Sequence, residues 1–111
     1  MVSQLIGLEE IRRAVGKVCS GRPIKSVELF GSRATGRFHA SSDVDLLVEF
    51  DADAKIGLFE LGEIREDLAE QLGVDVDIVS RRALERGRNA IRRESILSHT
   101  VPLYARCLVT A

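Results

Sequence analysis

Residues 29–50 read LFGSRATGRFHASSDVDLLVEF, and this stretch decides which fold and which kind of site the chain is expected to have. A glycine and a serine, Gly31 and Ser32, end one apolar run, and Asp43 and Asp45 lie within the next. Aspartate is a poor strand former, and burying an unpaired carboxylate costs free energy. The two aspartates therefore need something that compensates for this cost.

The rest of the chain places strands and helices around this stretch. Apolar, β-prone runs predict strands over residues 24–30, 43–50 and 74–79. Residues 31–42 form the expected loop between the first two strands, with room for one helical turn. Apolar residues at helical spacing predict helices over the first ~20 residues, over 58–72 with Gly73 as its stop, and over 88–99. Residues 101–109 are expected to form a last short extended segment.

This order of elements bounds the fold class. Helices and strands alternate as α-β-β-α-β-α, which is typical of an α+β (or α/β) domain with a small sheet flanked by helices. A chain of 111 residues suits one domain, residues 1–111, and 45% hydrophobic residues are enough for a core. Three phenylalanines, Phe30, Phe50 and Phe59, are expected in that core.

The aspartates alternate with apolar residues in two of the predicted strands. Side chains point to opposite faces of a strand in turn, so Asp43 and Asp45 share the face that Val44 and Leu46 avoid. In 74–79, Asp75 and Asp77 likewise point away from the apolar residues. If the two strands are neighbours in register, three or four carboxylates converge.

Converging carboxylates repel one another unless a cation lies between them. Mg²⁺ prefers carboxylate oxygens, water and phosphates, whereas zinc would require a Cys or His cluster that the sequence lacks. The alternative is that these aspartates are ordinary solvent-facing residues of a one-sided sheet. A lone D-x-D would favour that alternative, but the second aspartate pair and the preceding glycine turn favour the metal site.

The turn at Gly31 has the chemistry of a phosphate-binding loop. Glycine allows the backbone to approach a ligand closely, and a serine hydroxyl and backbone N–H groups hold phosphate oxygens. Arg33 and Arg37 would add charge-assisted contacts. An ordinary surface turn is the alternative. Residues 31–38 also approach the P-loop pattern, but they lack its lysine and its final hydroxyl, so we reject that interpretation.

Charge is distributed unevenly along the chain. The formal net charge is -1, yet residues 43–77 hold twelve acidic against two basic residues, and residues 78–111 hold seven arginines against two glutamates. The basic tail faces solvent, a nucleotide, an acidic partner or nucleic acid; nucleic acid is disfavoured because no aromatic residues interleave the arginines. Two cysteines far apart, no leader and no membrane-length apolar run predict a cytoplasmic protein.

At this point the sequence resembles a known family. The spacing of Gly31, Ser32 and Gly36, followed by SDVDLLVEF at residues 42–50, resembles the G-S-x-x-x-G…S-D-x-D-L-x-V signature of minimal nucleotidyltransferases in the DNA polymerase β superfamily. Residues 58–73, 76–80 and 92–104 are similar to the helix, third strand and tail of that family, so the resemblance covers roughly residues 26–104. It implies a polymerase-β-like fold with a small mixed sheet.

The resemblance also implies a reaction. ATP or another NTP would be attacked at its α-phosphorus by a hydroxyl, and two Mg²⁺ ions would assist. Asp75 departs from the family pattern, which commonly has a basic or polar residue there, and is expected to act as an outer-sphere partner or a bystander. The implied nucleotide-binding residues are Gly31, Ser32, Arg33, Asp43 and Asp45, and the implied metal-binding and catalytic residues are Asp43, Asp45 and Asp77.

Within this family, stand-alone domains typically accompany a small helical HEPN protein, an RNase toxin. The resemblance therefore implies an antitoxin that transfers an NMP, with AMP from ATP as the expected case, to a tyrosine of the HEPN partner. Two alternatives stay open: an antitoxin that neutralises its partner by binding alone, and a nucleotidyltransferase that acts on RNA or a small molecule.

Overall fold

The computed structural model describes residues 7–36 and 43–105. Within them, four strands form one mixed sheet in the order β3-β2-β1-β4. Strand β2 (Val44–Phe50) pairs antiparallel with β1 (Ile24–Phe30) and parallel with β3 (Val76–Ser80), and β4 (Val101–Ala105) pairs antiparallel with β1. The expected small mixed sheet is confirmed.

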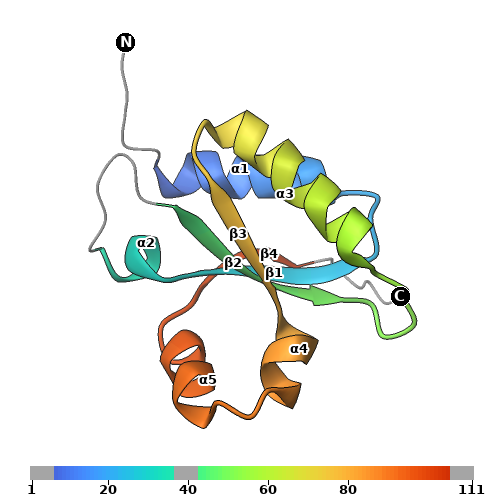
Figure 1. Ribbon diagram of the computed structural model, residues 1–111. Coiled ribbons are helices and arrows are strands. Elements are labelled where there is room, and N and C mark those ends of the chain that lie inside the picture. Colours follow the sequence, from blue (N-terminus) through green and yellow to red (C-terminus); the bar gives the residue numbers. More distant parts are fainter. Residues whose placement is uncertain (1–6, 37–42, 106–111) are drawn as a thin grey trace, which may run out of the picture.

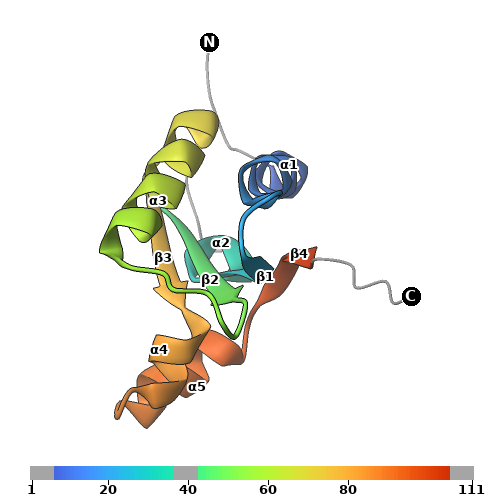
Figure 2. The same ribbon diagram turned by 90° about the vertical axis from the view of Figure 1, so that its right-hand side faces the viewer.

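Two layers of helices cover opposite faces of this sheet (Figures 1 and 2). Helices α1 (Leu8–Cys19) and α3 (Leu58–Leu72) lie on one face, and α4 (Arg81–Arg86) and α5 (Ala90–Leu97) lie on the other. A short helix, α2 (Ser32–Thr35), follows β1 directly. Among the described residues no helix is long and apolar enough to cross a membrane.

Successive side chains of β2 point to opposite faces of the sheet and therefore belong to two different hydrophobic cores. Val44, Leu46 and Val48 face α1 and α3 in the larger core, where Val15 of α1 and Leu68 of α3 are almost fully buried. Leu47 faces the other way. It packs in a smaller core under α4 and α5, whose remaining members are Phe30, Val79, Leu84 and Ile96. The α4–α5 side of the sheet therefore carries the odd-numbered residues of β2.

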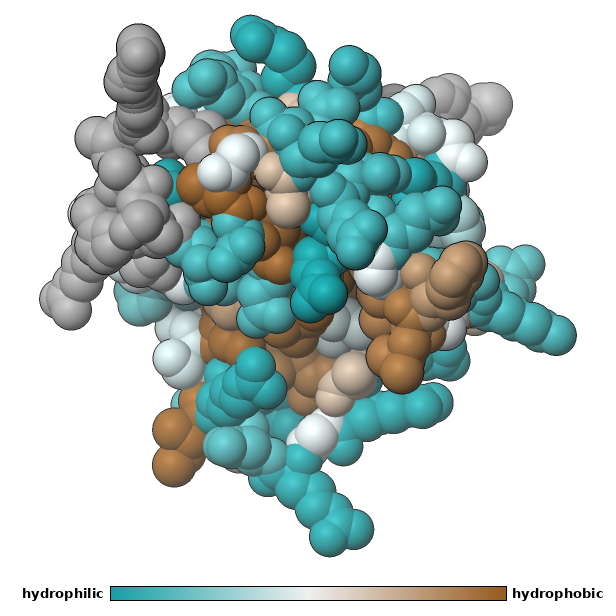
Figure 3. Space-filling view, turned by 45° about the horizontal axis from the view of Figure 1, so that its top comes forward, coloured by the Kyte–Doolittle hydropathy of each residue, from teal (hydrophilic) through white to brown (hydrophobic). Residues whose placement is uncertain are grey.

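The structure corrects three expectations from the sequence. Phe59 is 85% exposed and lies outside the core, beside Leu58 at the start of α3, where a hydrophobic patch stands out at the right of Figure 3. The first turn of α3 contributes nothing to the core, since the buried residues of this helix are Ile64 and Leu68. Helix α4 was not predicted. The third strand begins at Val76 and ends at Ser80, so Asp75 precedes it.

Candidate active site

The decisive feature of the site is the register between β2 and β3. Asp45 and Asp77 are direct partners in this parallel pair, as are Leu47 and Val79 two residues further along. Neighbouring strands lie about 4.8 Å apart, and partner residues point to the same face of a sheet. Because Leu47 and Val79 belong to the core under α4 and α5, Asp45 and Asp77 face that same side.

Asp43 directly precedes β2 and is exposed, and it completes the acidic group formed with Asp45 and Asp77. The pKa of Asp45 is raised above its usual value, first because this carboxyl is partly buried, and then because Asp77 and Asp43 repel its negative charge. The three carboxylates are thus close enough to influence one another. Among the described residues, no Lys, Arg or His forms an ion pair with any of the three.

The backbone at Gly31 lies directly against this acidic group. It follows Phe30, the register partner of Asp45, and its φ of +80° lies in the left-handed region. A Cβ placed on Gly31 would overlap the carboxylate of Asp45. Only glycine therefore satisfies both the backbone conformation and the contact with Asp45 at this position.

The structure also places the remaining residues of the turn. The Gly31 carbonyl accepts hydrogen bonds from the N–H groups of Ala34 and Thr35 and so starts α2. Arg33 is only 7% exposed, so its side chain lies within the protein and does not project into solvent. The side chain of Ser32, together with residues 37–42, which include Arg37 and Phe38, lies outside the described part of the chain.

The carboxylates of Asp43, Asp45 and Asp77 are of the ligand type that a hard cation prefers, but their side chains do not converge on one point. Among the described residues, no three Asp, Glu, His or Cys side chains form a group that could hold a metal ion as they stand. Like charges that lie close together repel one another unless a cation lies between them. Carboxylates brought to one face by strand register nevertheless fit Mg²⁺, because they are its preferred ligand type.

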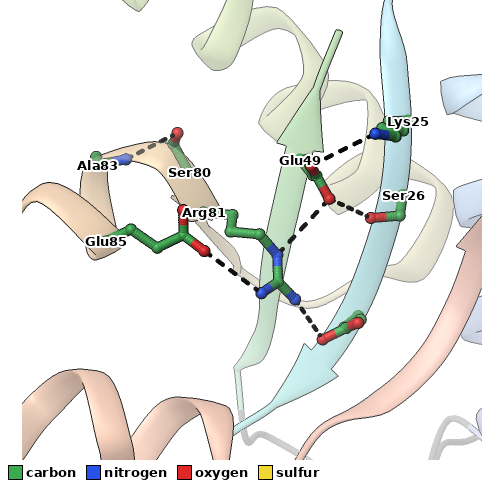
Figure 4. Close-up of polar contacts among 8 residues, drawn as sticks. Lys25, Ser26, Glu49, Ser80, Arg81, Ala83 and Glu85 are labelled. Carbon is green, nitrogen blue, oxygen red and sulfur yellow. Dashed lines mark hydrogen bonds and ion pairs between the residues drawn. The ribbon is translucent and has the colours of Figure 1, made fainter. Parts of the chain in front are cut away.

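A second acidic group lies further along the same strands, and an arginine of the protein contacts all of its carboxylates (Figure 4). Arg81, the first residue of α4, contacts three glutamates. Its Nη2 lies 3.0 Å from Oε1 of Glu28, its Nε lies 3.8 Å from Oε1 of Glu49, and its Nη1 lies 3.9 Å from Oε2 of Glu85. We call this set of four residues the Arg81 cluster.

A pocket of about 470 Å³ adjoins the Arg81 cluster rather than the aspartates. It is lined by Lys25 of β1, by Phe50 and Asp51 at the end of β2, and by Ser80 and Arg81 where β3 passes into α4. Asp45 and Asp77 lie at the other end of these strands. This pocket is therefore separate from the aspartates that are predicted to catalyse the reaction.

Sequence reasoning missed Arg81. The signal was present: Glu28 and Glu49 alternate with apolar residues in their strands, and an arginine follows the third strand directly. Their meeting depends on the antiparallel register of β1 and β2, in which Glu28 pairs with Leu47, two residues before Glu49. That register is not visible in the sequence.

Comparison with known proteins identifies the class. Residues 11–102 match the nucleotidyltransferase domain family, so the chain belongs to that family. "Putative protein adenylyltransferase MJ1379" of Methanocaldococcus jannaschii is 35% identical over 78 residues, which make up 69% of this chain and 78% of the relative. The chain is a nucleotidyltransferase of the minimal type in the DNA polymerase β superfamily.

Solved structures agree with this assignment. A "putative minimal nucleotidyltransferase" is 34% identical, with a TM-score of 0.68 over 91% of this chain and 100% of that chain. A complex described as a tri-AMPylated Shewanella oneidensis HEPN toxin with its MNT antitoxin includes a chain that is 18% identical, with a TM-score of 0.62 over 89% of this chain and 73% of that chain. At this identity the second likeness shows the fold alone.

Proposed function

We propose that this chain transfers an NMP from an NTP, most simply AMP from ATP, to a tyrosine hydroxyl of a HEPN-type toxin and thereby acts as its antitoxin. The observation that carries the proposal is the register pairing of Asp45 with Asp77, on the face of the sheet that Gly31 also adjoins. Because the chain belongs to the nucleotidyltransferase family, we interpret this pair of carboxylates as part of the site of nucleotidyl transfer. The names of the M. jannaschii relative and of the AMPylated HEPN complex support a protein as the acceptor.

The reaction assigns a separate task to each part of the site. The acceptor oxygen forms a bond to the α-phosphorus, and the bond between the α-phosphorus and the bridging oxygen of the β-phosphate breaks, which releases pyrophosphate. Asp77, which is exposed beside Asp45, would take the proton of the hydroxyl as it attacks. The backbone of Gly31, whose left-handed conformation allows a close approach, would hold the triphosphate together with the start of α2.

Asp43, Asp45 and Asp77 are the residues that would hold Mg²⁺. When bound there, the metal supplies positive charge that offsets the repulsion among the carboxylates and the charge of the triphosphate. The raised pKa of Asp45 is consistent with this role, because a carboxyl destabilised by its acidic neighbours gains most from an added cation.

The test combines purified chain, MgATP and a HEPN-type protein from the same genome, and follows the HEPN protein by intact mass. We expect a mass increase of one or more AMP groups on the HEPN protein and none on added RNA. The Asp43→Asn/Asp45→Asn variant should abolish this increase. Asp51→Asn/Asp53→Asn is the matched control, since it removes two aspartates of the same spacing at the far end of β2.

Two other outcomes of this test would each support one of the alternative functions. If Asp43→Asn/Asp45→Asn leaves the HEPN protein unmodified but still protects cells from it, the chain neutralises by binding. If RNA or a small molecule is labelled instead of the protein, the acceptor class is wrong.

A further inference from the structure

The helices on the side of the sheet that Asp45 and Asp77 face form a strongly basic surface. Helices α4 and α5 and the residues between them, 81–98, contain six arginines and two glutamates. We call residues 81–98 the basic hairpin. Two of its arginines are engaged: Arg81 in its cluster, and Arg93, which donates a hydrogen bond to the Gly87 carbonyl. The remaining four are exposed, and within the described residues their side chains form no hydrogen bond or ion pair: Arg82, Arg86, Arg88 and Arg92.

The basic hairpin is fixed beside the candidate site. Leu84 of α4 and Ile96 of α5 are buried against Phe30, Leu47 and Val79. Phe30 directly precedes Gly31, and Leu47 and Val79 lie two residues after Asp45 and Asp77 on the same face of their strands. Figure 1 shows both helices on this side of the sheet, below the strands. A molecule that rests on the hairpin therefore lies on the side of the sheet that Asp45 and Asp77 face.

Apolar side chains are exposed among these arginines. Ile91 is 83% exposed and Leu97 is 36% exposed, and both line a shallow hollow on the outer side of α5. The other residues lining this hollow are Arg93, Glu94, Ser95 and Ser98. Arginine is enriched at protein–protein interfaces, so exposed apolar residues on an arginine-rich pair of helices are consistent with such an interface.

We propose that the basic hairpin is the docking surface for the acceptor protein, and that the acceptor covers it with an acidic surface carrying an apolar contact for Ile91. This inference rests on the proposed function and adds the place and chemistry of recognition. Nucleic acid is the less suitable occupant because residues 81–98 contain no aromatic side chain on which bases would stack.

The test measures the affinity of the chain for a HEPN-type protein from the same genome by titration calorimetry. Arg88→Ala/Arg92→Ala removes two unpaired charges from the hairpin; Arg88 lies between the two helices, and alanine at position 92 preserves helix formation in α5. Arg13→Ala/Arg65→Ala is the matched control, because it makes the same change of charge on exposed residues of α1 and α3, on the other side of the sheet. Both variants are also titrated with MgATP and with a 20-nucleotide RNA.

We expect the hairpin variant to raise the Kd for the HEPN protein roughly 10- to 100-fold, with the control within about twofold, because charge pairs across an interface contribute on this scale. The difference should shrink as salt is added. Ile91→Ser should weaken binding without this salt dependence. The Kd for MgATP should not change.

Failure of the docking proposal differs from failure of the proposed function. Equal affinities of the hairpin variant and the control, or weaker binding of MgATP or RNA by the hairpin variant alone, would overturn the docking surface while AMP transfer persists. A chain that binds the HEPN protein through the hairpin but transfers no AMP would support the docking surface and refute the transfer.

Discussion

Two acidic groups lie along the same side of the sheet, and they differ in whether a basic side chain of the protein contacts them. At one end Glu28, Glu49 and Glu85 surround Arg81, whose guanidinium lies within 3.0–3.9 Å of all three carboxylates. At the other end Asp43, Asp45 and Asp77 lie near one another, and in the described part of the chain no basic side chain forms an ion pair with them.

The difference indicates which group is structural. The Arg81 cluster joins β1 and β2 to α4 through ion pairs with a single guanidinium. The aspartate group raises the pKa of Asp45 through burial and like charge, which costs free energy in the isolated chain. A group that destabilises its own fold is better explained by a ligand than by architecture.

The largest expected effect comes from neutralising one carboxylate at each end. Asp77→Asn should lower AMP transfer about 10³-fold, because it removes a proton acceptor and a cation ligand together. Glu28→Gln should leave kcat within about twofold, because in the described residues the ion pair of Glu28 is with Arg81 and not with a group of the candidate site. Initial rates with the HEPN protein measure both. Comparable losses of AMP transfer in the two variants would show that the two acidic groups do not differ in function.

Gly31→Ala is expected to have the next largest effect. The new Cβ would displace the Asp45 carboxylate, so activity should fall about 10²-fold, and left-handed backbone adds about 1–2 kcal/mol of instability. Gly73→Ala is the control, since Gly73 has a φ of +75° and an added Cβ there would meet no atom within 4 Å. It should show the loss of stability with full activity. Urea unfolding and initial rates separate the two effects.

Arg81→Met is expected to lower the free energy of unfolding by about 1–2 kcal/mol, because it leaves the half-buried Glu28 without its cation and Glu49 with only its 3.9 Å contact to Lys25. Adding Glu28→Gln should restore part of this loss. Urea unfolding at low and high salt measures both variants. A double variant that is as unstable as Arg81→Met would show that Arg81 contributes through packing instead of charge.

The smallest effect is the dependence of stability on pH. The raised pKa of Asp45 means that the folded chain holds a proton that the unfolded chain has already lost. Between those two pKa values the free energy of unfolding therefore falls as the pH rises. Asp45→Asn should remove this contribution and be more stable than the native chain at neutral pH. Thermal unfolding from about pH 4 to neutrality, compared between the two proteins, measures it.

Several elements follow from local sequence patterns. The strand expected at residues 24–30 is β1, and the helix expected at 58–72 is α3, because hydrophobic periodicity reports how a segment will face a core. The same periodicity placed Asp45 and Asp77 on the faces of their strands that avoid the larger core. Helix α4 was missed because it has six residues and one buried apolar residue, Leu84, too few to show a period.

Exposure and pairing depended on tertiary structure. Phe59 has the chemistry of a core residue, yet it lies on the first turn of α3, which extends beyond the packed part of the helix. Arg33 has the chemistry of a surface residue, yet it is buried. The sequence by itself determined which residues share a face, since alternation within a strand is a local property. Only the tertiary structure decided that Asp45 meets Asp77 and that Arg81 meets Glu28, because register joins segments that are far apart in the chain.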